Sequence, residues 1–132
     1  MTRQDLEDAR KIYYQLKILR ESAERIESAV QGGAIQYDKE KVQTSVKNQH
    51  ETLLVILADL TSEIEEKEAE LIRLKEEISE WAGTLSNFNK AIIILRYCQC
   101  LSWDDISEYL GYSSRQIRRI NEEILWQIEQ TV

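Results

Sequence analysis

The chain has 132 residues, which suits a single domain or a small domain carried on a helical arm. Hydrophobic residues make up 42% of it and charged residues 31%, so the composition is too apolar for a disordered protein. There is no proline, there are only four glycines, and β-branched residues rarely alternate with polar ones. We therefore expect an all-α fold with long helices.

The net charge of −7 argues against nucleic-acid binding when it is taken alone, because affinity for DNA depends on neutralising phosphates. The charge is unevenly distributed, however. Residues 1–87 carry 12 basic and 18 acidic side chains, or −6, whereas residues 88–132 carry 5 and 6, or −1. Three of those five basic residues lie within five positions: Arg115, Arg118 and Arg119.

A first helix is predicted over about residues 5–30, where apolar residues recur at steps of four and three. They are Ile12, Leu16, Leu19, Ala23, Ile26 and Val30. This spacing is a heptad pattern that forms one apolar face of a helix. The pair Gly32-Gly33 should end the helix, since glycine adopts left-handed backbone conformations at little cost. The polar segment 34–45 is expected to be a loop or a short irregular crossing.

A second, longer helix is predicted over about residues 46–81, roughly 54 Å in length. Its heptad seam is continuous: Leu53, Leu57, Leu60, Ile64, Lys67, Leu71, Leu74, Ile78 and Trp81. Such a seam must be covered by the first helix folded back as an antiparallel hairpin, by a second chain, or by both. Lys67 is the single charged member. It is either a stem that keeps its ammonium in water or a device that sets register and oligomeric state.

The segment Gly83-Thr84-Leu85-Ser86-Asn87 breaks this helix, so we predict an arm over residues 1–82 and a separate module over 86–132. The module should contain three helices, over about 88–100, 103–110 and 114–130. Ser102 and Asp105 are placed to cap the second of these, and Ser113 and Gln116 to cap the third. Gly111 lies in the short turn between them. Two capped helices joined in this way are typical of a helix-turn-helix.

The last helix is the candidate recognition helix. If Ile117, Ile120, Ile124 and Ile128 are buried, helical geometry turns five polar residues outward: Ser114, Arg115, Arg118, Arg119 and Glu122. We expect Arg115 and Arg118 to contact bases, and Arg119 with Ser113 or Ser114 to contact phosphates. The alternative is that the arginines only solvate the helix and pair with Glu122 and Glu123.

The module resembles the fourth region of bacterial sigma factors. More closely, it is similar to the C-terminal module of ArpU-like phage transcriptional regulators. The residues that carry the resemblance are Leu95-Arg96-Tyr97, Leu101-Ser102-Trp103-Asp104-Asp105-Ile106, Leu110-Gly111-Tyr112-Ser113 and Arg115-Gln116-Ile117. The resemblance implies a small activator of phage or prophage genes whose recognition helix corresponds to residues 114–123. Cys100 and Ser107 depart from it, because such modules usually carry glycine and alanine there.

Other residues favour no catalytic or metal site. Cys98 and Cys100 lack a second ligand pair, so we expect a buried Cys98 and a Cys100 at a helix end rather than zinc ligands. His50 is expected at the surface, and Trp103 and Trp126 are expected to pack around the module. We predict no enzyme activity and no cofactor. The absence of a signal peptide and of a long apolar run favours the bacterial cytoplasm over the membrane.

The leading hypothesis is therefore a transcriptional regulator that binds double-stranded DNA as a homodimer through the seam over residues 53–81, alone or with bacterial RNA polymerase. One alternative is a phage assembly component such as a small terminase subunit, which also joins a helix-turn-helix to helical oligomerisation segments. Another is a structural or polymerase-binding coiled-coil protein in which the module only packs. Replacing Arg115 and Arg118 would leave the function of such a protein unchanged.

Overall fold

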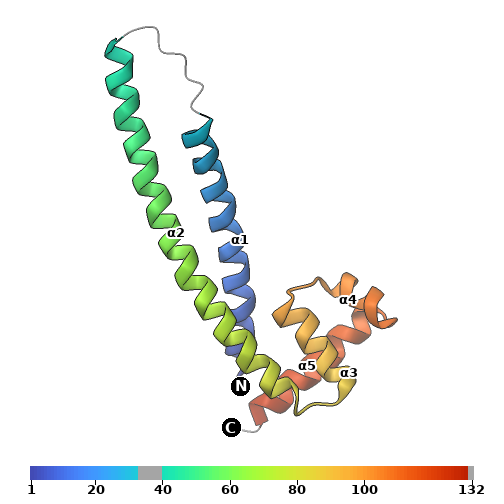
Figure 1. Ribbon diagram of the computed structural model, residues 1–132. Helices are drawn as coiled ribbons and strands as arrows, with labels where there is room; N and C mark the ends of the chain where they lie inside the picture. The colour runs from blue at the N-terminus through green and yellow to red at the C-terminus, as the bar shows by residue number, and fades with distance from the viewer. Residues whose placement is uncertain (33–39, 131–132) are drawn as a thin grey trace. The chain divides into compact units, whose positions relative to one another are not determined.

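The computed structural model describes residues 1–32 and 40–130, with side chains described from residue 47 onward in the second range. Within these ranges the chain is all-α and contains no strand (Figure 1). Its elements are α1 (Arg3–Gln31), α2 (Glu40–Ala82), α3 (Asn87–Ile93), a π-helical turn η1 (Ile94–Cys98), α4 (Trp103–Leu110) and α5 (Ser114–Gln130). No helix in the described ranges is long and apolar enough to cross a membrane.

The two long helices lie where the heptads predict them, with one correction. Helix α2 begins at Glu40 rather than near Val46, so the predicted loop is wrong over residues 40–45. The run Glu-Lys-Val-Gln-Thr-Ser contains no proline or glycine, and its polar residues are mostly compatible with a helix. Helix α1 ends at Gln31, and the N–H of Gly32 donates to the Ser28 carbonyl. Gly33 and the rest of the predicted loop, residues 34–39, lie outside the described residues.

The chain forms two compact units, one made of residues 1–14 and 69 onward and the other of residues 15–68. In the unit over 15–68, the two helical segments run antiparallel. Arg20 pairs with Glu68 at 2.8 Å, and Nε2 of His50 lies 3.1 Å from the Val30 carbonyl oxygen. His50 is therefore half-buried against the end of α1, whereas the sequence predicts a residue at the surface.

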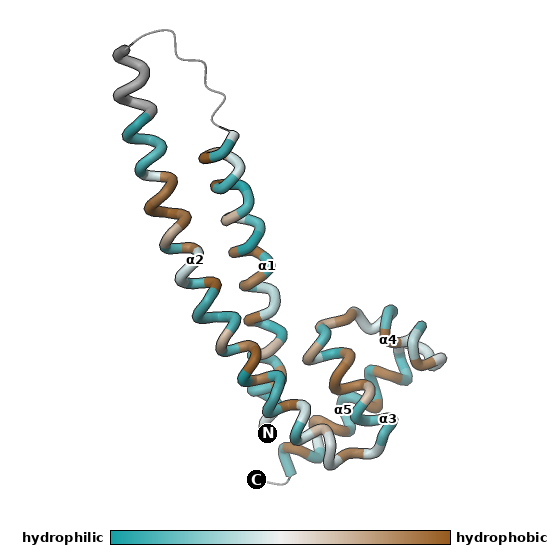
Figure 2. Tube along the Cα trace, in the orientation of Figure 1, coloured by the Kyte–Doolittle hydropathy of each residue, from teal (hydrophilic) through white to brown (hydrophobic). Residues whose placement is uncertain are grey.

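Apolar side chains of this unit remain accessible. The seam residues Leu53, Leu57, Leu60 and Ile64 are only half-buried, as is Lys67. Leu54, Val55 and Ile56 are exposed by 45%, 61% and 40%. Figure 2 shows the hydrophobic colouring concentrated in this part of α2. Within this unit, the α1 segment therefore covers only part of the apolar surface of α2.

The other unit has a well-buried core. Leu6, Ala9 and Ile12 of α1, and Leu71, Leu74 and Ile78 of α2, are buried. The two ends of the predicted arm, residues 1–14 and 69–82, thus belong to the same compact unit as the C-terminal helices. Within those helices, Ile92, Ile106 and Ile117 form a fully buried cluster. Around it pack Phe88, Leu95, Leu101, Trp103, Leu110 and Ile120.

The helix predicted over 88–100 is real but changes geometry midway. Helix α3 continues into the π turn η1, where the N–H of Gln99 donates to the Ile94 carbonyl at 3.0 Å, five residues back. The wider turn leaves Tyr97 and Cys98 both buried. Cys100 follows with a φ of 56°, in the left-handed region that favours glycine. A glycine would adopt this backbone conformation more readily than cysteine does.

One tryptophan does not pack as predicted. Trp103 is half-buried beside the cluster, but Trp126 is 60% exposed. The buried face of α5 includes Asn121 and Leu125 beside the predicted isoleucines, so it extends toward the opposite side of the helix from Trp126. The expectation that Trp126 packs around the module is therefore wrong.

Candidate nucleic-acid interface

Local hydrogen bonds define the two helices and the turn between them. Ser102 Oγ accepts the N–H of Asp105 at 3.1 Å at the start of α4. Gly111 ends α4 with a φ of 75°, and its N–H donates to the Ser107 carbonyl. At the start of α5 the capping box is complete. Ser113 Oγ accepts from the Gln116 N–H at 3.2 Å, and the Gln116 side-chain oxygen accepts from the Ser113 N–H at 3.0 Å.

The turn between the helices is held by side chains from both sides. The Ser107 hydroxyl donates to the Tyr112 carbonyl oxygen, so Ser107 fixes the turn. Tyr112 packs edge-on against Phe88, with ring centroids 4.9 Å apart. Because the end of α4 and the start of α5 are both capped and the turn between them is fixed, the first turn of α5 has a defined position relative to α4.

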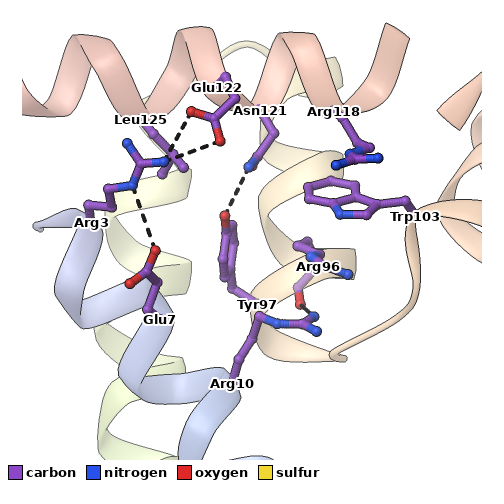
Figure 3. A pocket seen from close by; sticks show the side chains of 10 residues that line it. All are labelled: Arg3, Glu7, Arg10, Arg96, Tyr97, Trp103, Arg118, Asn121, Glu122 and Leu125. Atoms are coloured by element: carbon purple, nitrogen blue, oxygen red, sulfur yellow. Dashed lines mark hydrogen bonds and ion pairs between the residues drawn. The ribbon is translucent and has the colours of Figure 1, made fainter. Parts of the chain in front are cut away.

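The three arginines of α5 are all exposed, as predicted, but they do not lie on one face. Arg115 and Arg119 are one helical turn apart on the face opposite the buried residues. Arg118 lies nearer the buried face, where it lines a cavity together with Trp103 (Figure 3). Among the described residues, none of the three forms an ion pair with a carboxylate.

The alternative prediction, in which Glu122 pairs with these arginines, does not hold in the structure. Glu122 is exposed, as expected, but its carboxylate binds the Arg3 guanidinium at 3.0 Å. Arg3 also pairs with Glu129 at 3.2 Å and lies 3.7 Å from Glu7. Arg3 is therefore neutralised, and Glu122 joins α5 to the beginning of α1 rather than screening Arg118.

Both predicted serines already have partners in the protein. Ser113 Oγ donates to the side-chain oxygen of Gln116 at 3.1 Å, as part of the cap. Ser114 is half-buried, and its hydroxyl donates to the Asp104 carboxylate at 2.6 Å. The hydroxyl hydrogens of these serines are therefore engaged, whereas the arginine side chains near this end of α5 have no hydrogen-bond partner among the described residues.

Behind α5 lies a cavity of about 320 Å³ within the same compact unit (Figure 3). Ten residues line it: Arg3, Glu7, Arg10, Arg96, Tyr97, Trp103, Arg118, Asn121, Glu122 and Leu125. Its two carboxylates, Glu7 and Glu122, both contact Arg3. Within the described ranges, Arg10, Arg96 and Arg118 form no ion pair, so the cavity wall carries an excess of positive charge.

Two of these arginines are held by neutral groups. The Arg96 guanidinium lies 3.9 Å from the centroid of the Trp103 ring and donates to the Leu101 carbonyl at 3.0 Å. Burial lowers the pKa of Arg96, and the nearby charge of Arg10 lowers it further. Arg10 donates to the Arg96 carbonyl at 3.1 Å and to the Tyr14 hydroxyl at 3.2 Å. The Arg10 guanidinium is thus held at the Arg96 backbone, near enough for its charge to act on the Arg96 side chain.

A buried amide also lines the cavity. Asn121, only 2% exposed, donates from Nδ2 to the Tyr97 phenolic oxygen at 2.9 Å. Its Oδ1 is buried and has no hydrogen-bond partner in the part of the chain that the structure describes. The amide therefore has one unused hydrogen-bonding position beside the arginines.

Sequence patterns did not identify this cavity. Arg10 and Arg96 are 86 residues apart, and Arg10 is an ordinary polar residue just before the apolar heptad that begins at Ile12. Arg96 stood in the resemblance motif without an assigned role, and Asn121 fell between predicted core isoleucines. A polar residue at a buried position of α5 is the one local signal that could have indicated it.

Comparisons with known proteins identify the family alone. No curated protein and no solved structure matches the chain. Residues 8–130 match the family described as "Protein of unknown function (DUF722)", and this match covers most of both compact units. The chain therefore belongs to the DUF722 family.

Proposed function

We propose that the protein is a sequence-specific regulator of transcription that binds double-stranded DNA through α5, in keeping with the resemblance to ArpU-like regulators of phage and prophage genes. The observation that carries the proposal is the capped start of α5, which follows a fixed turn and presents arginines that have no carboxylate partner in the described ranges. The N-terminal turns of such a helix are the part that reaches base edges in a major groove.

Arg115 and Arg119 are the best placed of the three arginines for this role. Both are exposed on the outer face, and a guanidinium can bind a guanine edge or a phosphate in a bidentate manner. Arg118 is nearer the cavity, so a base contact from it would require its side chain to turn outward. We therefore assign direct readout first to Arg115, with Arg119 at a phosphate.

A single copy of the module would bind weakly, because it carries few basic residues and Asp104 lies beside the start of α5. Dimerisation would offset this by raising the effective concentration of the second module. Leu71, Leu74 and Ile78 are already buried within one chain, whereas the seam over residues 53–64 is not. We therefore place the dimer contact in that half of the predicted seam.

The test is a titration with duplex fragments of random sequence and with fragments from upstream of the gene's own operon, at two salt concentrations. We expect saturable binding that weakens as salt rises. Arg115→Ala should cost about 1–3 kcal/mol on the preferred fragment and reduce its preference over random DNA. Arg119→Ala should weaken binding to all fragments and reduce the salt slope by about one.

The matched control is Arg25→Ala, which removes an exposed arginine with the same change of net charge from α1. It should leave both the affinity and the preference unchanged. Absence of saturable binding by the wild-type protein at low salt would contradict independent DNA binding. Equal losses in Arg25→Ala and Arg115→Ala would contradict the assignment to α5.

A further inference from the structure

We propose that the cavity lined by Arg10, Arg96 and Arg118 is a binding site for a phosphate group. The three guanidinium groups come from α1, η1 and α5 and line one cavity (Figure 3). The site is distinct from the outer face of Arg115 and Arg119, and it does not depend on whether α5 reads DNA.

The charge balance of the cavity points to an anion. The carboxylates of Glu7 and Glu122 contact Arg3, which leaves three positive side chains without a negative partner in the described part of the chain. Like charges held together in a partly buried place repel each other, and an anion between them removes that repulsion. Guanidinium groups are the side chains best matched to phosphate, because each offers a planar fork of N–H donors.

The site is organised before any ligand arrives. The ring of Trp103 and the Leu101 carbonyl hold Arg96, while the Arg96 carbonyl and Tyr14 hold Arg10. Arg118 forms no hydrogen bond among the described residues, so its side chain can move onto a ligand at little cost. Arg96 and Arg10 are therefore fixed donors and Arg118 is an adjustable one. Ligand sites commonly use a few such polar groups to orient the ligand.

Asn121 supplies a second, independent observation. Its Oδ1 is covered by protein and has no partner among the described residues, so this acceptor becomes available to a ligand hydroxyl or to a retained water when the amide turns toward the cavity. The volume of about 320 Å³ accommodates more than a bare phosphate ion. The bound group therefore belongs either to the DNA backbone or to a free phosphorylated molecule, and the chemistry is shared by both.

Calorimetric titration of the full chain with inorganic phosphate, at constant ionic strength, tests the site. We expect saturable binding to one site per chain. Arg118→Gln and Arg10→Gln should each weaken it by about tenfold or more, since each removes a charge-assisted hydrogen bond. Arg115→Gln is the matched control, because it makes the same charge change on the outer face of α5 and should leave phosphate affinity unchanged.

Arg118 is exposed and forms no hydrogen bond with the described residues, and removing its charge relieves repulsion in the cavity, so Arg118→Gln should melt at or above the wild-type temperature when phosphate is absent. Absence of saturable phosphate binding to the wild-type chain would overturn the proposal. So would equal weakening by Arg115→Gln and Arg118→Gln, which would show only a general effect of charge.

Competition with a DNA duplex then identifies the source of the phosphate. If inorganic phosphate displaces DNA, and Arg118→Gln reduces the salt slope of DNA binding by about one, the site holds a backbone phosphate. If phosphate binds while DNA binding is absent or unaffected, the site holds a free phosphorylated molecule. If the α5 proposal fails, the wild-type chain does not bind DNA but still binds inorganic phosphate.

Discussion

The side-chain amide of Asn121 donates a 2.9 Å hydrogen bond to the phenolic oxygen of Tyr97, and both residues are buried. The bond joins α5 to the π turn η1. A buried polar pair of this kind favours one arrangement of the two elements over sliding alternatives, because any shift leaves two polar groups unsatisfied.

Tyr97→Phe should therefore destabilise the fold. It leaves the Asn121 Nδ2 group buried without an acceptor, which costs about 1–3 kcal/mol in the free energy of unfolding. Adding Asn121→Leu should recover part of that loss, because the pair is then apolar on both sides. Urea denaturation of the two single variants and the double variant measures the coupling. Tyr109→Phe, at a position 73% exposed, is the control, and a loss in Tyr97→Phe no larger than in this control would contradict the role.

Cys100 should tolerate glycine but not valine. Its φ of 56° is a conformation that β-branched residues rarely adopt, so Cys100→Val should lower the free energy of unfolding by about 1–2 kcal/mol. Cys100→Gly relieves the backbone strain but loses a small buried side chain, and the two effects should nearly cancel. Thermal melting of the pair tests this, with Cys98→Val as control at a buried helical position. Equal losses in Cys100→Val and Cys100→Gly would contradict the backbone explanation.

Stability should fall in alkaline solution because of the two thiols. Burial raises the pKa of Cys98 and of Cys100 above the ordinary value of 9.0. A raised pKa means that the folded chain holds protons that the unfolded chain releases. The stabilisation is therefore complete below about pH 9 and is lost as the pH rises through the folded-state values. Urea denaturation at a series of pH values should show this decline. A variant with Cys98→Ala and Cys100→Ala should show a shallower one, and an identical slope would contradict the cause.

The oligomeric state should depend on the exposed apolar residues of α2. Val55→Glu places a charge at a position 61% exposed in the single chain, so it should leave the fold intact but weaken a dimer formed over residues 53–64. Ile72→Glu makes the same change on the same helix at a position 58% exposed and should leave association unchanged. Sedimentation velocity over a range of concentrations distinguishes the two. A wild-type monomer at every concentration would contradict the dimer.

The short helices were predictable because their signals are local. Ser102, Gly111, Ser113 and Gln116 act on backbone groups within four residues, and the structure shows each bond or conformation that they imply, including Ser102 Oγ accepting from the Asp105 N–H. The predicted start of α2 was wrong because no such local signal marks it. Residues 40–45 are polar but contain no helix-breaking residue, and polarity alone does not end a helix.

The cavity and the position of Trp126 were not predictable, because both depend on which segments cover α5. The isoleucine stripe locates the side of α5 that packs on α3 and α4. Residues 1–14 cover a further flank, where Arg3 reaches Glu122 and Leu125 is buried. That contact spans 119 positions of sequence and has no local signature. Trp126, one position beyond Leu125, consequently points to solvent.

The π turn at Ile94–Cys98 acts as one extra residue inserted into an otherwise regular helix. Residues before it and after it therefore follow two different helical phases, offset by about 100°. A relative that lacks the turn would need one residue fewer to bring the same side chains to the core, and an alignment should place a single-residue gap there. Removing one residue from 94–98 would restore a regular helix, but it would rotate Phe88 and Ile92 away from their neighbours or shift everything from Leu101 onward.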